Sequence, residues 1–338
     1  GDTVLLKAGN YPESVLVTKA ITIRGEEPGT AVIEIAEGCT TDTSTWETSC
    51  PPGVPTYALE ESDADGPYGF ALEGTDATIS DVRVHVHTLA AGVIVNGGSA
   101  SLEGLSATTE PDVGLVMNFD GGSRVSVVSS DLGRAWLLPN PDSHVTIEDS
   151  DFEAIFLNHT ADSEPNVLRD NRITGSIYFT GPMIIEGNEF TSRAEGWQFD
   201  PYITADGMDW VVQDNTFVGA EGPQGAISVG NLAGPGTIKG HTFTDNEVGI
   251  FLASRALLEV AGNVISDGDT GIQVTGGAPT LVDNTIEGMS EFGVTMIISE
   301  PTLSGNTLCG NAVDLFIGSG SEPVVDADNE ICVTKTPE

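Results

Sequence analysis

Aromatic rings and carboxylates gather in one short segment of this sequence, residues 196–210 (GWQFDPYITADGMDW). The segment provides four aromatics and three acids, namely Trp197, Phe199, Tyr202 and Trp210 with Asp200, Asp206 and Asp209. Aromatic faces pack against the CH groups of a sugar ring and carboxylates bond its hydroxyls, so we expect the aromatics and Asp200 to bind a ligand. Two carboxylates about 5–10 Å apart can hydrolyse a glycosidic bond, so the three aspartates are the catalytic candidates if the protein is an enzyme. The alternative is that the aromatics fill a bulge in a core.

A second group with chemical potential is the strand-like segment from Arg83 to His87 (RVHVH). Alternation places His85 and His87 on one face, and a His-x-His pair can bind copper or zinc. The sequence offers no obvious third ligand, so solvated histidines are the simpler interpretation and no metal site is predicted. Residues 63–66 (DADG) resemble the start of a calcium loop but lack its glutamate, so an acidic loop is the simpler interpretation. No cofactor is predicted, and calcium is the one candidate considered.

These candidates lie in a chain with a strong internal repeat. The repeated phrase is an apolar residue, any residue, Asp or Gly, Asn, any residue and a bulky apolar residue, as in Leu303–Leu308 (LSGNTL). The asparagines of the phrase are Asn171, Asn188, Asn215, Asn263, Asn284, Asn306 and Asn329, with His241 taking the place once. Degraded copies upstream put Ser150, Ser130, Leu105 and Val82 at this position. The spacing is about 22 residues, and a period of this length indicates a solenoid.

Each repeat also carries a small residue followed by alternating bulky apolar residues, as in Gly271-Ile-Gln-Val274. This alternation predicts a strand, and further strands are expected before and after the asparagine. Asparagine tolerates the left-handed backbone region and bonds neighbouring backbone, so we place it at a sharp bend. Stacked in register, the asparagine amides should form a ladder along the axis.

With these repeats the chain resembles the right-handed parallel β-helix proteins of the pectin-lyase-like superfamily, in particular their sugar-binding and sugar-hydrolase repeat type. Gly1–Gly25 (GDTVLLKAGNYPESVLVTKAITIRG) is similar to the first coil of such domains. The resemblance implies an all-β solenoid of about 12 coils of roughly 22 residues, with three short strands per coil. We expect a single domain over residues 1–338, with inserted loops at 37–67 and 196–210. An N-terminal cap is expected to be missing, which makes this chain part of a longer one.

In enzymes of this superfamily the substrate groove usually runs over the outer face of the Gly-Ile-x-Val-type strands, and the resemblance implies the same face here. In the first coils the residues expected to point outward form an apolar stripe that predicts an interface or a surface covered by a loop, namely Ile94, Val116, Leu137 and Phe156. Tyr178 and Asn158 are further ligand-binding candidates on this face. The predicted outward rows hold only Glu73 and Asp200 as acids, which argues against a hydrolase there.

Composition narrows the context. The net charge is −39, which argues against nucleic acid and, unless calcium bridges the two, against an anionic polysaccharide. Two local cysteine pairs predict the disulfides Cys39–Cys50 and Cys309–Cys332, the second joining adjacent coils. Paired cysteines favour an extracellular, cell-surface or periplasmic location, and no membrane-inserted segment is visible.

We therefore expect a secreted binding or scaffold module of a bacterial-type protein that recognises carbohydrate or a protein partner. A polysaccharide-cleaving enzyme, either a glycoside hydrolase or a lyase, with its site in residues 196–210 is the first alternative. A purely structural acidic spacer is the second.

Overall fold

The computed structural model describes residues 2–35, 39–42, 47–52, 56–58, 65–87, 90–109, 115–133, 135–139, 142–157, 164–191, 203–205, 209–230, 235–253 and 258–336. Every regular element among these residues is a β-strand. The part of the chain described includes no helix long and apolar enough to cross a membrane. The chain divides into two compact units, Gly1–Asn158 and His159–Glu338.

Unit 1 is built from strands β1 to β18. Their bounds are β1 Asp2–Leu6, β2 Gly9–Tyr11, β3 Val15–Val17, β4 Ile21–Gly25, β5 Ala31–Ile35, β6 Thr40–Asp42, β7 Glu47–Ser49, β8 Thr56–Ala58, β9 Asp65–Ser80, β10 Val82–Val86, β11 Ala90–Glu103, β12 Ser106–Thr109, β13 Leu115–Asp120, β14 Arg124–Val128, β15 Ala135–Pro139, β16 His144–Glu148, β17 Asp151–Phe152 and β18 Ala154–Leu157. Apart from the antiparallel pairs β6–β7 and β8–β9, neighbouring strands pair in parallel.

Unit 2 is built from strands β19 to β42. Their bounds are β19 Asn166–Arg169, β20 Arg172–Ile173, β21 Ile177–Phe179, β22 Met183–Glu186, β23 Glu189–Thr191, β24 Ile203–Ala205, β25 Trp210–Gln213, β26 Thr216–Val218, β27 Ile227–Val229, β28 Gly236–Lys239, β29 Thr242–Thr244, β30 Val248–Leu252, β31 Leu258–Ala261, β32 Val264–Ser266, β33 Thr270–Thr275, β34 Thr280–Val282, β35 Thr285–Glu287, β36 Phe292–Ile297, β37 Thr302–Ser304, β38 Thr307–Leu308, β39 Val313–Ile317, β40 Val324–Val325, β41 Glu330–Ile331 and β42 Thr334–Lys335.

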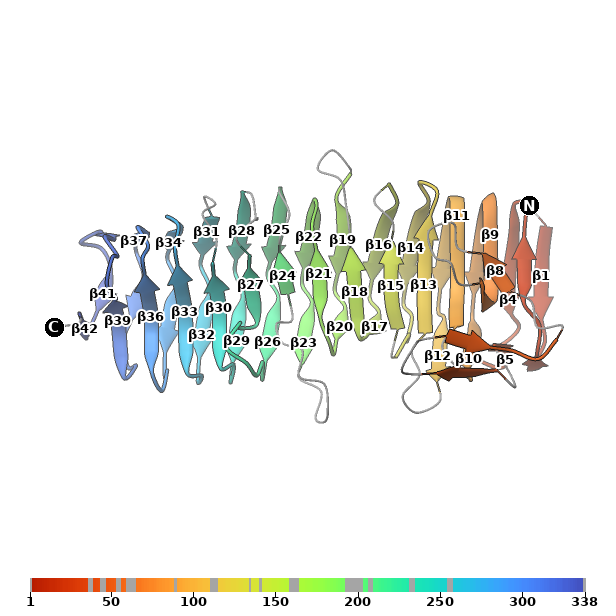
Figure 1. Cartoon of the computed structure of the whole chain (residues 1–338), viewed down its shortest axis with the longest axis horizontal. Coiled ribbons are helices and arrows are strands. Elements are labelled where there is room, and N and C mark those ends of the chain that lie inside the picture. The colour runs from red at the N-terminus through yellow and green to blue at the C-terminus, as the bar shows by residue number, and fades with distance from the viewer. Residues whose placement is uncertain are drawn as a thin grey trace. The chain divides into compact units, whose positions relative to one another are not determined.

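Most described coils contribute one strand to each of three sheets, whereas the coil of β13 and β14 has only an isolated bridge at Asp131 in the third. The first sheet holds the Gly-Ile-x-Val-type strands, the second the strands that precede the asparagine position, and the third the strands that follow it. In unit 2, β30, β33, β36 and β39 of the first sheet therefore lie side by side, one coil after the next (Figure 1). In unit 1 the long strands β9 and β11 take part in both the first and the second sheet. The predicted all-β parallel solenoid with three strands per coil is confirmed.

The core lies between the sheets, because each parallel pairing puts equivalent inward side chains on top of one another. In unit 2, Phe190, Phe217 and Phe243 are buried and stack with ring centroids 4.6 and 4.8 Å apart. Each of them lies two residues after the asparagine position. The bulky residue that ends the repeated phrase is thus the one that fills the interior.

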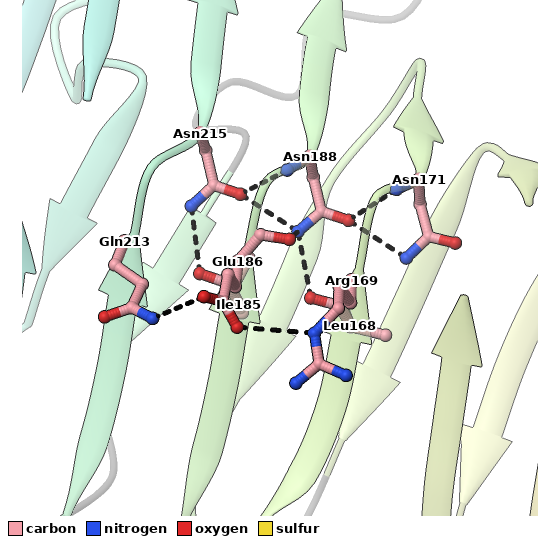
Figure 2. Close-up of polar contacts among 8 residues, drawn as sticks. All are labelled: Leu168, Arg169, Asn171, Ile185, Glu186, Asn188, Gln213 and Asn215. Atoms are coloured by element: carbon pink, nitrogen blue, oxygen red, sulfur yellow. Dashed lines mark hydrogen bonds and ion pairs between the residues drawn. The ribbon is translucent and has the colours of Figure 1, made fainter. Parts of the chain in front are cut away.

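The asparagine ladder of unit 2 is confirmed (Figure 2). The side-chain oxygen of Asn188 accepts from both the backbone N–H and the side-chain amide of Asn171, each at 2.9 Å. Asn215 does the same for Asn188, at 2.7 and 2.9 Å. The pattern continues from Asn263 through Asn284 and Asn306 to Asn329, and the remaining side-chain N–H groups donate to strand carbonyls such as Leu168 O. Buried polar groups are thereby satisfied by the neighbouring coils on both sides.

One expectation about the bend is wrong. The residue in the left-handed region is the one before the asparagine, with φ between 50° and 70°, and not the asparagine itself. In unit 2 these residues are Asp170, Gly187, Asp214, Gly240, Gly262, Asp283 and Gly305. Glycine adopts this conformation freely and aspartate adopts it more readily than most residues, which explains why the repeated phrase has Asp or Gly at this place.

His241 replaces asparagine in the ladder by matching its polar atoms. Its Nδ1 accepts from the backbone N–H of Asn215 at 2.9 Å, so Nε2 carries the proton and donates to Val212 O at 3.0 Å. Burial lowers the pKa of His241 to about 4, because a second ring proton would have to be accommodated in a dry site that already points a donor at Nδ1. The imidazole therefore acts as a neutral stand-in for the amide.

Two further asparagines in unit 2 accept backbone hydrogen bonds at a turn that the sequence did not predict. Asn246 accepts from Ala220 N at 2.8 Å, and Asn311 accepts from Met289 N at 2.9 Å. The fully buried carboxylate of Asp314 accepts from the backbone and side chain of Asn311 and, at 2.7 Å, from Val333 N. Backbone amides at the turn that holds Asn246 and Asn311 are thus satisfied in the same way as those at the asparagine ladder.

Both predicted disulfides are present, Cys39–Cys50 in unit 1 and Cys309–Cys332 in unit 2. Cys332 follows β41 and Cys309 follows β38, and these two strands pair in parallel. The second disulfide therefore joins adjacent coils, as the spacing of its cysteines predicts.

Candidate functional site

The segment 196–210 contains a strand of the solenoid. Ile203–Ala205 form β24, and Thr204 pairs with Tyr178 in the outward row of the first sheet. Trp197, Asp200, Tyr202 and Asp206 lie outside the described residues, as does Asn158 of unit 1. Of the proposed acid and base residues the structure therefore places only Asp209, which is exposed at the turn before β25.

Trp210 differs from its expected role. It opens β25 with its side chain pointing inward and is only 1% exposed. The indole lies over Gly236, where no Cβ would fit, and meets Phe179 edge-on with ring centroids 6.1 Å apart. Its ring is part of the core, so the alternative that an aromatic fills a bulge describes Trp210, and it offers no open face to a ligand.

The predicted apolar stripe of unit 1 needs three corrections. Leu137 is fully buried and pairs with Met117, so it points inward and the outward row is displaced by one residue at β15. Ile94 does lie in an outward row, yet it is only 2% exposed because it packs with Tyr68 and Ala71. Neither residue is available as an interface. Val116 is half-buried and pairs with Ala91, whereas Ile94 pairs with Asn118, because an irregularity in β11 shifts the register. The side chain of Phe156 lies outside the described residues.

Ile94 is buried by side chains of the outer face of the first sheet. Tyr68, Ala71 and Ile94 form a small apolar cluster on the outside of the first sheet, with Ala91 packed against it. The end of the 37–67 insertion adds β8, which pairs antiparallel with the start of β9. An outward apolar stripe in these coils therefore packs within the chain.

The outward row of the first sheet is confirmed for unit 2. Strand pairing puts its members in one line, namely Tyr178, Thr204, Ser228, Phe251, Gln273, Thr295 and Phe316. Tyr178 is half-buried. Thr204, rather than the predicted Gln198, occupies the place after Tyr178, because the insertion before β24 shifts the strand along the sequence. These described residues include no acid, which matches the acid-poor face expected.

A depression of about 520 Å³ lies on a face that the sequence did not indicate, the outside of the second sheet in unit 1. Its floor is a row of hydroxyl side chains, one per coil, called here the hydroxyl row, which consists of Thr22, Thr78, Ser101, Ser126 and Thr146. A parallel row beside it consists of Asp76, Ser99, Arg124 and His144. Coils are about 4.8 Å apart, so both rows form a regular ladder of polar groups.

The second row supplies charge and an unpaired ring nitrogen. Arg124 pairs in register with His144 on one side and with Ser99 on the other. Asp76 accepts from Ser99 N at 3.1 Å. The Nδ1 atom of His144 is buried and has no hydrogen-bond partner among the described residues. A polar atom of this kind is commonly satisfied by a bound molecule or water.

A weak sequence signal for this depression exists. Each coil of unit 1 has a hydroxyl residue between two inward apolar residues, as in Ile21–Ile23 (ITI), Ala77–Ile79 (ATI), Val125–Val127 (VSV) and Val145–Ile147 (VTI). In unit 2 the equivalent strand positions of the first coils hold Val167, Ile184 and Val211. Hydroxyl residues are common on strands, so the signal becomes specific only once the register is known.

The structure also brings together residues that the sequence kept apart. His85 and His87 lie on one face, as expected, and Glu34 from β5 joins them as a third residue with metal-binding atoms. Glu34 could not be predicted as their neighbour, since β5 and β10 are separated by the 37–67 insertion.

Comparison with known proteins supports the fold. Residues 205–329 match the family model of the right-handed β-helix region, and no curated protein matches the sequence. Tailspike protein 3 of bacteriophage CBA120 has a similar structure, with a TM-score of 0.54 and 11% identity over 99% of this chain and 56% of that one. The Dettilon tailspike protein gives a TM-score of 0.52 and 10% identity over 96% and 62%. The catalytic unit of a GH87 α-1,3-glucanase from Streptomyces thermodiastaticus gives 0.49 and 14% over 98% and 64%.

The chain thus spans a little over half of the two tailspike chains. At such identities the similarity establishes the fold, and the expected right-handed parallel β-helix is confirmed.

Proposed function

We propose that this chain, which has the right-handed parallel β-helix fold, is a binding module that recognises a neutral carbohydrate through the depression on the second sheet of unit 1. The observation that carries the proposal is the hydroxyl row, because Ser and Thr hydroxyls each donate and accept, as sugar hydroxyls do. Its volume lies within the range of about 300–1,000 Å³ typical of small-ligand sites.

The charges in the depression fit a neutral ligand. Arg124 and Asp76 contribute one charge of each sign, and the net charge of the chain is −39. Long-range attraction for a polyanion is therefore absent, while both charged groups can bond to hydroxyls. The unpaired Nδ1 of His144 adds one more polar atom for a ligand to meet.

The two disulfides support a location outside the cytoplasm, where oxidised cysteines persist. An extracellular or periplasmic site is also where polysaccharides are met. A protein partner and a purely structural role remain the competing proposals, and each predicts no saturable glycan binding.

The test is a glycan array followed by calorimetry with the best neutral oligosaccharide. Removing one floor hydroxyl, in Thr78→Val, Ser126→Ala or Thr146→Val, should weaken binding about fivefold, since a neutral hydrogen bond contributes about 1 kcal/mol. The matched control is Thr302→Val, which changes the same row in unit 2 and should leave affinity unchanged.

Equal losses in the control and in the floor variants would disprove the location. Absence of any glycan binding would favour the protein-partner or structural proposals. Release of new reducing ends or of unsaturated sugar products would instead support the polysaccharide-cleaving alternative. In that case Asp200→Asn, Asp206→Asn and Asp209→Asn should be assayed next.

A further inference from the structure

Three side chains with metal-binding atoms converge on the third sheet of unit 1. Strands β5 and β10 pair in parallel with Glu34 directly opposite His85. His87 follows on the same face, and its Nε2 lies 2.9 Å from Glu34 Oε2. The rings of His85 and His87 meet edge-on with centroids 4.5 Å apart. One ligand atom from each residue lies within 4.8 Å of the other two, so small side-chain rotations bring all three around one ion.

Neighbouring groups hold these side chains in place. The carboxylate side chain of Glu34 is only 13% exposed and the His87 side chain 29%, so neither moves freely in solvent. The backbone N–H of His87 donates to Ile35 O, which fixes the chain after β10. Thr108 lies opposite His85 on β12, with its Oγ1 2.9 Å from His85 Nδ1. A hydrogen bond from Nδ1–H to Thr108 selects the tautomer that keeps a lone pair on Nε2.

One cation lies on the same face. Arg83 is two residues before His85, and its Nε is within 3.4 Å of Ser106 Oγ, which directs the guanidinium toward β12. The strongly negative chain favours cations overall. The hydrogen bond between Glu34 and His87 does not explain why His85 contacts His87 or why Thr108 orients the His85 ring. A site that uses all three side chains explains both contacts.

We propose that Glu34, His85 and His87 form a binding site for a divalent transition-metal ion such as Zn²⁺. Two imidazoles and one carboxylate suit zinc and copper, whereas Ca²⁺ prefers oxygen ligands alone. Three protein ligands leave coordination positions open for water or a further molecule. The group Cys309, Cys332 and Glu330 in unit 2 is unsuitable, because its two sulfurs are joined in a disulfide.

The experiment is a calorimetric titration of the full chain, without a histidine tag, with Zn²⁺ at neutral pH. Wild type should bind one ion in the micromolar range. His85→Ala and His87→Ala should weaken this binding about 100-fold, Glu34→Gln somewhat less, and the orienting variant Thr108→Val about tenfold. His144→Ala, which removes a histidine elsewhere in unit 1, is the matched control and should bind Zn²⁺ as wild type does.

A second measurement avoids dependence on variants that fail to fold. Zn²⁺ should protect His85 and His87 of the wild type, but not His144, from modification by diethyl pyrocarbonate, read by mass spectrometry of peptides. Wild type that binds Zn²⁺ only at millimolar concentrations would overturn the proposal. So would equal protection of His144, or an equal loss of affinity in His144→Ala and His87→Ala.

Discussion

The bend before the third sheet is built differently in the two units. In unit 2 it holds asparagines whose side chains bond to one another and to backbone across coils. In unit 1 the same position is filled by Val82, Leu105, Ser130 and Ser150, all buried. There the hydroxyl of Ser130 accepts from Leu105 N at 3.1 Å, and that of Ser150 accepts from Ser130 N at 3.1 Å.

The comparison shows what the bend requires. In both units a backbone N–H at the bend is satisfied by a side-chain acceptor from the next coil. The backbone N–H of Leu105 donates to the next coil, but the Leu105 side chain cannot accept from the coil before it. The series of bonds from coil to coil therefore starts at Leu105. An asparagine amide accepts through its oxygen and donates through a separate N–H group to a strand carbonyl, such as Val260 O. A serine must accept and donate through one hydroxyl, as Ser150 does when it donates to Glu148 O. The fold therefore tolerates bend residues without an acceptor in a few coils, whereas serine and above all asparagine satisfy the bend through their side chains.

The largest effect should follow loss of a central ladder amide. Asn284→Ala removes the acceptor of both N–H groups of Asn263 and leaves Val260 O without its donor. Several buried polar groups lose their partners, so the free energy of unfolding should fall by about 4 kcal/mol. Urea denaturation followed by circular dichroism measures the change, and amide exchange of residues 258–266 locates it. A cost as small as that of Ser150→Ala would contradict the comparison.

The next effect concerns His241 and pH. Its pKa is about 4 in the folded protein and about 6.5 in the unfolded chain, so as pH falls the unfolded state takes up the proton first. The stability that the neutral ring contributes is complete above about pH 6.5 and is lost progressively toward pH 4, by about 3 kcal/mol.

His241→Asn should remove this part of the pH dependence, because an amide does not titrate. The measurement is the difference in unfolding free energy between the two proteins from pH 7 to pH 4, in which the titration of their shared carboxylates cancels. A difference that stays constant over this range would show that His241 is not held neutral.

A smaller effect separates two glycines of the bend. Gly187 and Gly262 both have φ near 65°, but a Cβ on Gly187 would meet the Asp170 carboxylate, whereas one on Gly262 would meet open space. Gly262→Ala should cost about 1 kcal/mol for the left-handed backbone alone, and Gly187→Ala about 2 kcal/mol. Chemical denaturation of the two variants tests this, and equal costs would show that the Asp170 side chain moves aside freely.

The smallest effect is expected in unit 1. Ser150→Ala removes the acceptor of Ser130 N and the bond to Glu148 O, so unfolding should become about 1 kcal/mol easier. Ser126→Ala, on the outer face of the neighbouring strand, is the stability control and should change the unfolding free energy by less than about 0.5 kcal/mol. A Ser150→Ala cost equal to that of Asn284→Ala would mean that serine supports the bend as well as asparagine does.

Much of the fold could be predicted because it repeats. The positions of Asn188, Asn215 and Asn284, and of Ser130 and Ser150 at the same bend, follow from a period that is visible over many coils. The left-handed residue lies one position before the predicted asparagine, because both asparagine and the preceding Asp or Gly favour turns and only the strand register separates them. The roles of Asn246 and Asn311 were not predicted, because their bend recurs in too few coils to show a period.

The candidate site was predicted far less well. Trp210 was expected in a loop and opens a strand with its ring inward, and Leu137 was assigned to the wrong face. In a strand the side chains alternate, so an error of one residue exchanges inside and outside. A change in coil length makes such an error easy, because it shifts the strand along the sequence. In the regularly spaced coils from β30 to β39 the outward residues were predicted correctly.

By itself the sequence determined the coil length, the inward apolar rows, the amide ladder and the cysteine pairs. Each of these repeats along the chain or lies between neighbouring coils, so local pattern carries it. Only the tertiary structure decided which outward residues share a surface, such as Arg124 beside His144 and Glu34 beside His85. Outward residues are not constrained by packing, and their neighbours depend on strand register across coils and insertions, which arises from pairing between distant segments.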